Sequence, residues 1–114
     1  MFKTALIDKT TELLDICKRL DITLTTAESC TGGMISALLT EIPGSSAVIY
    51  QSYVTYANTA KHAILGVASD ILKDKGAVSE EVVRAMAEGA VMISGANISV
   101  AVSGIAGPGG GTRD

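Results

Sequence analysis

The sequence predicts an α/β domain in which at least part of the sheet is parallel. Segments with apolar residues at every third or fourth position, which are typical of amphipathic helices, alternate with short runs rich in β-branched residues, which are typical of strands. Helices that connect such strands cover a layered sheet. The chain has 114 residues, of which 47% are hydrophobic and 18% charged, so we expect one domain with one core that spans residues 1–114.

The first expected helix runs to Leu20 and ends at Asp21. Its apolar stripe, which we expect to cover one face of the sheet, consists of Phe2, Leu6, Thr10, Leu13, Cys17 and Leu20. A second helix is expected over residues 33–41, because Pro43 and Gly44 follow and together form a strong helix break.

Two later helices are predicted from their end signals. Asn58 is expected to cap a short helix that ends before Gly66, and residues 71–72 are expected to form a further helical turn. Ser79 is expected to cap a longer helix that closes at Ala96-Asn97. Two glutamates follow Ser79, in the first turn, where the helix dipole favours negative charge.

Three strands are expected, over residues 22–27, 47–56 and 98–102. Functional side chains or glycines follow each of them, namely Glu28 and Ser29, then Tyr56, then Ser103 and Gly104. Because ligands collect at the carboxyl ends of parallel strands, we expect a functional site at this edge of the sheet.

The turn after the first strand carries the candidate nucleophile, Ser29. A strand that turns sharply into a helix leaves free backbone N–H groups, and those of Cys30, Thr31 or Gly32 would serve as oxyanion donors. In the alternative interpretation Ser29 is an ordinary helix N-cap. Glu28, the preceding residue, either orients the site or bonds to backbone amides.

Tyr56 and Lys61 are the candidate proton-transfer groups. They lie five residues apart, across an expected strand end and the first turn of a helix. A Tyr–Lys pair near a serine can move protons without histidine, because burial and neighbouring charge lower the pKa of a lysine. The alternative is a strand-end tyrosine and a solvated lysine.

Cys30 is a rival nucleophile. A thiolate needs an activating partner, and the single histidine of the chain, His62, follows a different strand. The segment from Gly104 to Gly111 is rich in glycine but lacks the Gly-Lys-Ser/Thr of a phosphate-binding loop. It is either a backbone nest for a phosphate or a mobile loop.

Composition limits the expected partners and cofactors. The net charge is −3 without a basic run, and aromatic residues make up 4%, so nucleic acid is not an expected partner. No apolar stretch is long enough for a membrane span. The cysteines, Cys17 and Cys30, lack metal-ligand spacing, and the sequence has neither a second histidine nor a carboxylate cluster, so no metal site is expected. No cofactor is expected either. We expect a reduced, cytoplasmic compartment and, because the third strand has an apparently open edge, a homo-oligomer.

Several segments together closely resemble the CinA C-terminal domain family. In order along the chain these are Thr26-Ala27-Glu28-Ser29-Cys30-Thr31-Gly32-Gly33, Pro43-Gly44-Ser45-Ser46, Val54-Thr55-Tyr56-Ala57-Asn58 with Lys61, Gly76-Ala77-Val78-Ser79-Glu80, and residues 103–112. The resemblance implies a three-layer α/β/α fold with a mixed five-stranded sheet. It also implies hydrolysis of nicotinamide mononucleotide to nicotinate mononucleotide and ammonia in pyridine-nucleotide recycling.

The resemblance also assigns residue roles. Ser29 would be the nucleophile, with Tyr56 and Lys61 as its proton-handling partners. The nucleotide substrate would contact the residues that match the family's binding positions, namely Thr31, Gly32, Gly33, Ser45, Ser46, Ser103 and Gly104.

The family continues past the glycine loop into two more strands and a final helix with a basic active-site residue. We therefore expect a domain that is incomplete at its C-terminus. The alternative function is a catalytically inactive nucleotide-binding or interaction module of the same fold.

Overall fold

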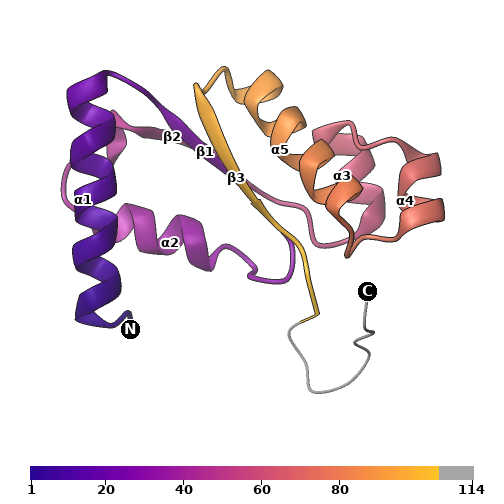
Figure 1. The fold of residues 1–114 in the computed structure, drawn as a ribbon, viewed down its shortest axis with the longest axis horizontal. Helices are drawn as coiled ribbons and strands as arrows, with labels where there is room; N and C mark the ends of the chain where they lie inside the picture. Colours follow the sequence, from indigo (N-terminus) through magenta and orange to yellow (C-terminus); the bar gives the residue numbers. More distant parts are fainter. Residues whose placement is uncertain (106–114) are drawn as a thin grey trace.

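The computed structural model describes residues 1–105. Figure 1 shows the elements of this range, which are α1 (Thr4–Leu20), β1 (Leu24–Glu28), α2 (Met34–Glu41), the 3₁₀ turn η1 (Ser45–Ala47), β2 (Ile49–Val54), α3 (Asn58–Leu65), α4 (Ser69–Lys75), α5 (Glu80–Ser94) and β3 (Ile98–Val102). Most of the glycine-rich segment from Gly104 to Gly111, for which a phosphate nest and a mobile loop were the two expectations, lies outside the described residues.

The three strands form one parallel sheet with the order β2-β1-β3. The mixed sheet implied by the family resemblance is therefore wrong for residues 1–105. Each strand is joined to the next through helices, and such a crossover returns the chain to the same end of the sheet.

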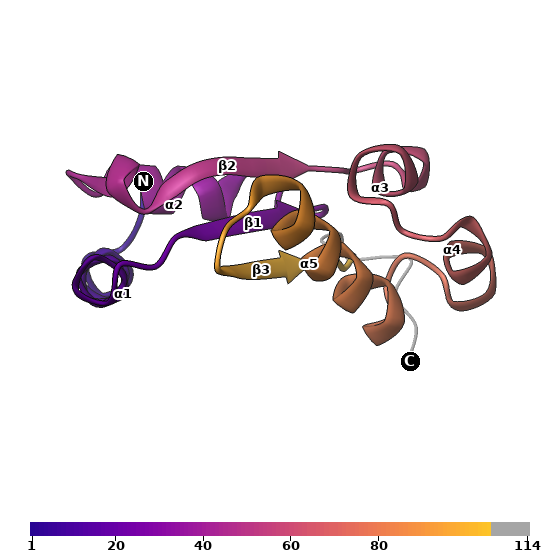
Figure 2. The same ribbon diagram turned by 90° about the horizontal axis from the view of Figure 1, so that it is seen from above.

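The central strand β1 is buried along its whole length. Leu24 contributes to a core formed with α1 and α2, whereas Ala27 contributes to a core formed with α3, α4 and α5. Because these two residues differ by an odd number of positions, their side chains point to opposite faces of the sheet. Helices thus cover both faces, as Figure 2 shows from above.

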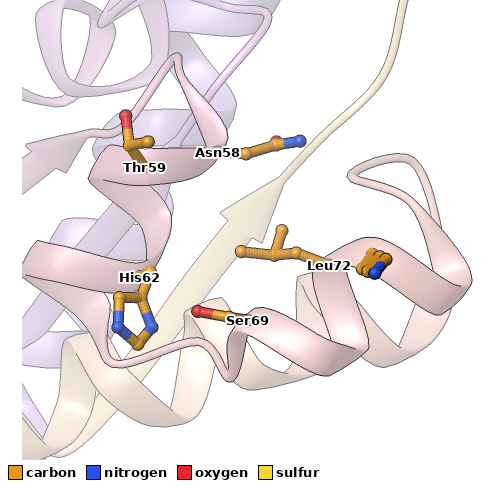
Figure 3. A pocket seen from close by; sticks show the side chains of 6 residues that line it. Asn58, Thr59, His62, Ser69 and Leu72 are labelled. Atoms are coloured by element: carbon orange, nitrogen blue, oxygen red, sulfur yellow. The ribbon is translucent and has the colours of Figure 1, made fainter.

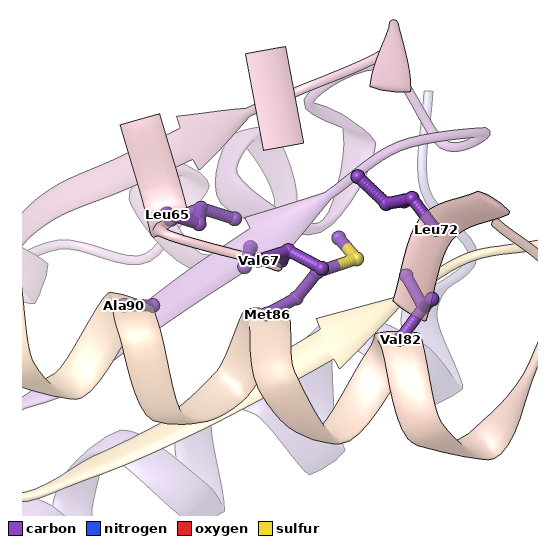
Figure 4. Close-up of a cluster of buried hydrophobic side chains, with 7 residues drawn as sticks. Leu65, Val67, Leu72, Val82, Met86 and Ala90 are labelled. Carbon is purple, nitrogen blue, oxygen red and sulfur yellow. The ribbon is translucent and has the colours of Figure 1, made fainter. Parts of the chain in front are cut away.

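The core on the side of α5 holds helix α3 in place. Figure 4 shows the side chains of this core, which come from α3, α4, α5 and the loop between α3 and α4, namely Leu65, Val67, Leu72, Val82, Met86 and Ala90. Gly89 of α5 lies so close to α3 that a Cβ atom built there would overlap the carbonyl group of Leu65. Glycine is therefore required for the approach of the two helices.

The core on the other side differs from the expected stripe of α1. The buried residues of this helix are Thr10, Leu14 and Cys17. Leu6 and Leu20, which were expected to face the sheet, are 46% and 65% exposed. Ile7 and Leu14 extend the apolar face of the helix beyond the expected stripe, and periodicity does not say which part of this broad face points inward. α1 packs against α2 and the segments beside it, so the expected orientation was wrong for half of the stripe.

Two cap predictions have different outcomes. The Ser79 Oγ atom accepts a hydrogen bond from the N–H of Val82 at 3.2 Å, which confirms Ser79 as the cap of α5. Asn58 is not the cap of α3, because Ala57 occupies that position and makes no side-chain bond.

Among the described residues, none of the helices is long and apolar enough to cross a bilayer. β3 forms one edge of the sheet, and the homo-oligomer expected from that edge stays a prediction.

We predict that Gly89→Ala destabilises the protein, although alanine is the better helix former by about 1 kcal/mol. Overpacking against the Leu65 carbonyl should outweigh that preference and lower the free energy of unfolding by about 1–3 kcal/mol. Urea unfolding measures the change, with Glu88→Ala on the exposed side of α5 as the control. A higher unfolding midpoint for Gly89→Ala would contradict the close approach of the helices.

Candidate active site

The carboxyl ends of the three strands meet around one cavity of about 280 Å³. Its lining residues come from the segments after β1 and β2, from α3, from the loop before α5 and from the end of β3, namely Ser29, Cys30, Tyr56, Lys61, Ala77, Val78, Ser103, Gly104 and Ile105. The parallel arrangement therefore brings together the chemical groups that follow each strand in the sequence.

Ser29 and Lys61 form a buried pair in this cavity. The Nζ atom of Lys61 lies 3.0 Å from the Oγ atom of Ser29. Lys61 is 1% exposed and Ser29 is 6% exposed. The solvated lysine considered as an alternative for Lys61 is therefore wrong.

Two backbone carbonyl groups hold the lysine in place. The Nζ atom of Lys61 lies 2.9 Å from the carbonyl oxygen of Thr55 and 2.8 Å from that of Tyr56. A neutral amine has two N–H donors and one lone pair. If the two carbonyls accept both N–H bonds, the lone pair faces the hydroxyl of Ser29, which is the arrangement required of a general base.

Burial lowers the pKa of Lys61, because a charged amine loses its hydration inside the protein; the neighbouring Cys30 acts more weakly in the opposite direction. The lowered pKa raises the fraction of neutral lysine near neutral pH. Geometry and electrostatics thus favour the same role for this side chain, that of a proton acceptor for Ser29.

The turn that carries Ser29 is shaped by glycine and closed by its own hydrogen bond. Gly32 and Gly33 have φ values of 61° and 103°, which side chains disfavour. The N–H of Gly32 donates to the carbonyl of Ser29 at 3.1 Å, so Gly32 is not an oxyanion donor. Within residues 1–105, the N–H groups of Cys30 and Thr31 have no acceptor, and these remain the candidate donors.

The remaining polar groups of this turn are engaged by Glu28. The hydroxyl of Thr31 and the N–H of Gly33 both donate to its carboxylate, at 2.6 and 3.2 Å. The Thr31 hydroxyl and the Gly33 N–H are therefore already bonded within the protein, and the substrate contacts expected of Thr31 and Gly33 stay predictions. Of the two roles considered for Glu28, the structure shows the bonds to backbone amides.

Tyr56 takes part through its backbone in the contacts that the structure shows. Its carbonyl oxygen accepts from Lys61 and lies 3.5 Å from the Oγ atom of Ser29. Its side chain borders the cavity but is 73% exposed. A role for its phenol in proton transfer stays a prediction.

Cys30 and His62 do not form a pair. The Nδ1 atom of His62 lies 2.8 Å from the carbonyl oxygen of Val67. Its ring borders a separate cavity of about 330 Å³ between α3 and α4, which Figure 3 shows. The Sγ atom of Cys30 instead faces Gly104, where a Cβ atom would lie 3.4 Å away. The thiol therefore lines the site without the histidine that would activate it.

Ser103 and Gly104 lie at the cavity, where β3 ends. The hydroxyl of Ser103 donates to the carbonyl of Ala77 at 2.7 Å and thereby ties the loop before α5 to the end of β3.

Ser45 and Ser46 lie at the other end of the sheet, near the amino ends of the strands. They precede β2, and in a parallel sheet the amino end of β2 lies opposite the carboxyl end of β1. The structure thus does not bring these two serines to Ser29 within one chain.

Sequence reasoning missed the backbone components of the site. The role of the Thr55 and Tyr56 carbonyl groups cannot be recognised from residue types, because every residue has the same backbone carbonyl.

Among the described residues, His, Cys, Asp and Glu side chains form no group of three that could hold a metal ion.

The fold and the pair together define an α/β protein with a serine–lysine site at the carboxyl edge of a parallel sheet. Residues 7–114 match the CinA C-terminal domain, and the chain belongs to this family. It is 60% identical over 94 residues to a CinA-like protein of Akkermansia muciniphila, which covers 82% of this chain and 23% of that protein.

Solved structures agree with this assignment. The competence/damage inducible protein CihA from Agrobacterium tumefaciens superposes with a TM-score of 0.95 at 46% identity, over 99% of this chain and 68% of that chain. A CinA superfamily protein from Escherichia coli gives 0.91 at 34% identity, over 97% and 66% of the two chains. The chain spans about a quarter of the curated relative from Akkermansia muciniphila.

We predict a pH-dependent difference in stability between the wild type and Lys61→Met. The folded pKa of Lys61 is lowered, so between that pKa and the unfolded value of about 10.4 the unfolded chain binds more protons. The stability contributed by this group therefore rises with pH through that window and is smallest below it. Urea unfolding of both proteins over a pH series measures the difference, and a difference that falls with rising pH would contradict the assignment.

Proposed function

We propose that the protein is an amidohydrolase that converts nicotinamide mononucleotide to nicotinate mononucleotide and ammonia. The observation that carries the proposal is the buried pair of Ser29 and Lys61, whose Oγ and Nζ atoms are 3.0 Å apart. Membership of the CinA family supports the reaction class. The substrate rests on the family resemblance of the sequence motifs.

In the first half of the reaction, neutral Lys61 accepts the hydroxyl proton of Ser29 while the Oγ atom forms a bond to the carboxamide carbon. The carbonyl oxygen becomes an oxyanion, which the N–H groups of Cys30 and Thr31 stabilise. Collapse of this intermediate breaks the C–N bond, and the proton held by Lys61 passes to the leaving nitrogen. Ammonia departs and an ester on Ser29 remains.

The second half reverses these roles with water. Lys61 takes a proton from water as its oxygen attacks the ester carbon, and the carbon–Oγ bond then breaks. The proton returns to Ser29 and the carboxylic acid product leaves. In this proposal the phenol of Tyr56, at the rim of the cavity, donates a hydrogen bond to the leaving nitrogen while Lys61 delivers the proton.

Substrate contacts are proposed for the residues that border the same cavity. Ser103 and Gly104 line it directly after β3, and the exposed Gly32 follows the lining residue Cys30 by two positions in the turn. The N-terminus of α2, which is a usual phosphate site, already holds the carboxylate of Glu28. We therefore place the phosphate of the substrate away from that helix end.

We predict that the wild-type chain releases ammonia from nicotinamide mononucleotide and that Ser29→Ala lowers kcat by about 10³-fold or more, because the nucleophile is lost. Cys30→Ala should keep most of the activity, since the mechanism uses only the backbone N–H of this residue. A coupled ammonia assay measures all three proteins. Loss of activity in Cys30→Ala together with retention in Ser29→Ala would transfer the nucleophile to the thiol.

The same assay separates the enzyme from the alternative function. If the wild type binds the nucleotide but releases no ammonia, the chain is a binding module and the amidohydrolase proposal is wrong for it.

A further inference from the structure

We propose that Glu28 is a positioning residue, which sets the geometry of the serine–lysine pair through two separate groups of atoms. Its carboxylate anchors the turn that carries Ser29, and its carbonyl anchors the segment that holds Lys61. The expected changes in kcat rest on the proposed function, whereas the positioning itself is inferred from the hydrogen bonds of Glu28.

The carboxylate of Glu28 is buried at the N-terminus of α2. Its Oε1 atom accepts from the hydroxyl of Thr31 at 2.6 Å, from the N–H of Gly33 at 3.2 Å and from the N–H of Ile35 at 3.0 Å. Its Oε2 atom accepts from the N–H of Ser36 at 2.9 Å. The side chain is 0% exposed and has no ion-pair partner within residues 1–105, so these four donors and the helix dipole must stabilise its charge.

The carbonyl group of the same residue reaches the other half of the pair. It accepts from the N–H of Thr55 at 2.8 Å, immediately after β2. The carbonyls of Thr55 and Tyr56 in turn hold the ammonium or amine of Lys61. Glu28 therefore links the turn that carries the nucleophile to the segment that holds the base.

This link also decides which amides remain available for the reaction. With Glu28 in place, the N–H groups of Gly33, Ile35 and Ser36 are occupied, and those of Cys30 and Thr31 are free. Without the carboxylate, the end of α2 would offer additional donors beside Ser29. Water or an anionic part of the substrate would then compete for a site that does not present the carboxamide to the serine.

The decisive variant is Glu28→Gln, which keeps the shape of the side chain but turns one acceptor into an NH₂ donor that faces another donor. We expect kcat to fall by about 10²-fold, as for a displacement of reacting groups by about 1 Å, while KM changes less than threefold. Cys17→Ala is the control, because this residue is buried in the core between α1 and α2 and makes no contact with the site. It should lower the melting temperature without lowering kcat.

Thr31→Val provides a second measurement that leaves Glu28 in place and removes one of its four donors. It should lower kcat at least threefold at unchanged KM. A kcat for Glu28→Gln and Thr31→Val within threefold of that of Cys17→Ala would overturn the proposal.

A fluorophosphonate probe separates failure of this inference from failure of the proposed function. Ser29 attacks the phosphorus atom and an O–P bond forms, while Lys61 accepts the hydroxyl proton and fluoride leaves. The labelling rate therefore reports the serine–lysine pair without nicotinamide mononucleotide. If the wild type releases no ammonia but is labelled, the proposed substrate is wrong, and at least tenfold slower labelling of Glu28→Gln still supports the role of Glu28. Equal labelling rates, or no labelling of the wild type, would overturn it.

Discussion

A buried lysine amine that lies 3.0 Å from a serine hydroxyl is the interaction on which this structure depends. An ammonium group without water is expensive to bury unless it is fully hydrogen-bonded. The protein supplies two backbone carbonyls and one hydroxyl, which match the three bonding positions of the amine. The same burial lowers the pKa of Lys61 and makes its neutral form available as a base. Burial of the Lys61 amine therefore explains both why it needs three hydrogen-bond partners and why its pKa is lowered.

The rest of the fold can be understood as the means of holding two chain segments at this distance. Ser29 follows β1 and Lys61 lies on α3, which is reached only after β2. Parallel pairing of the strands places both segments at one edge, and close packing of α5 against α3 at Gly89 fixes the second. Glu28 connects the two segments through its carbonyl and its carboxylate. Membership of the CinA family, with structural similarity to relatives at 34–46% identity, is consistent with this architecture.

Much of the architecture is predictable from the sequence, because local signals determine it. The cap of α5 at Ser79, the end of α1 at Asp21 and the β-branched run of β3 each specify an element without reference to the rest of the chain. The convergence of functional groups at one edge followed from parallel connectivity. The orientation of α1 did not follow, because its apolar face is broad and only packing against α2 determines which part of it is buried.

Site details were less predictable, since they depend on atoms that residue identity does not specify. Three features appear only in the folded structure. These are the burial of Lys61, the carbonyl acceptors of Thr55 and Tyr56, and the hydrogen bonds between the Glu28 carboxylate and the N-terminus of α2. The placement of Ser45 and Ser46 at the opposite edge likewise reflects sheet topology, which motif spacing does not encode.

The most direct test of this account is a pH titration of the Lys61 amine by ¹⁵N NMR in the wild-type protein, with Ser29→Ala as a reference. We predict a Lys61 pKa clearly below that of the exposed lysines, and a chemical shift that changes when the hydroxyl of residue 29 is removed. A Lys61 pKa at or above that of the exposed lysines would contradict the assignment of this residue as the base.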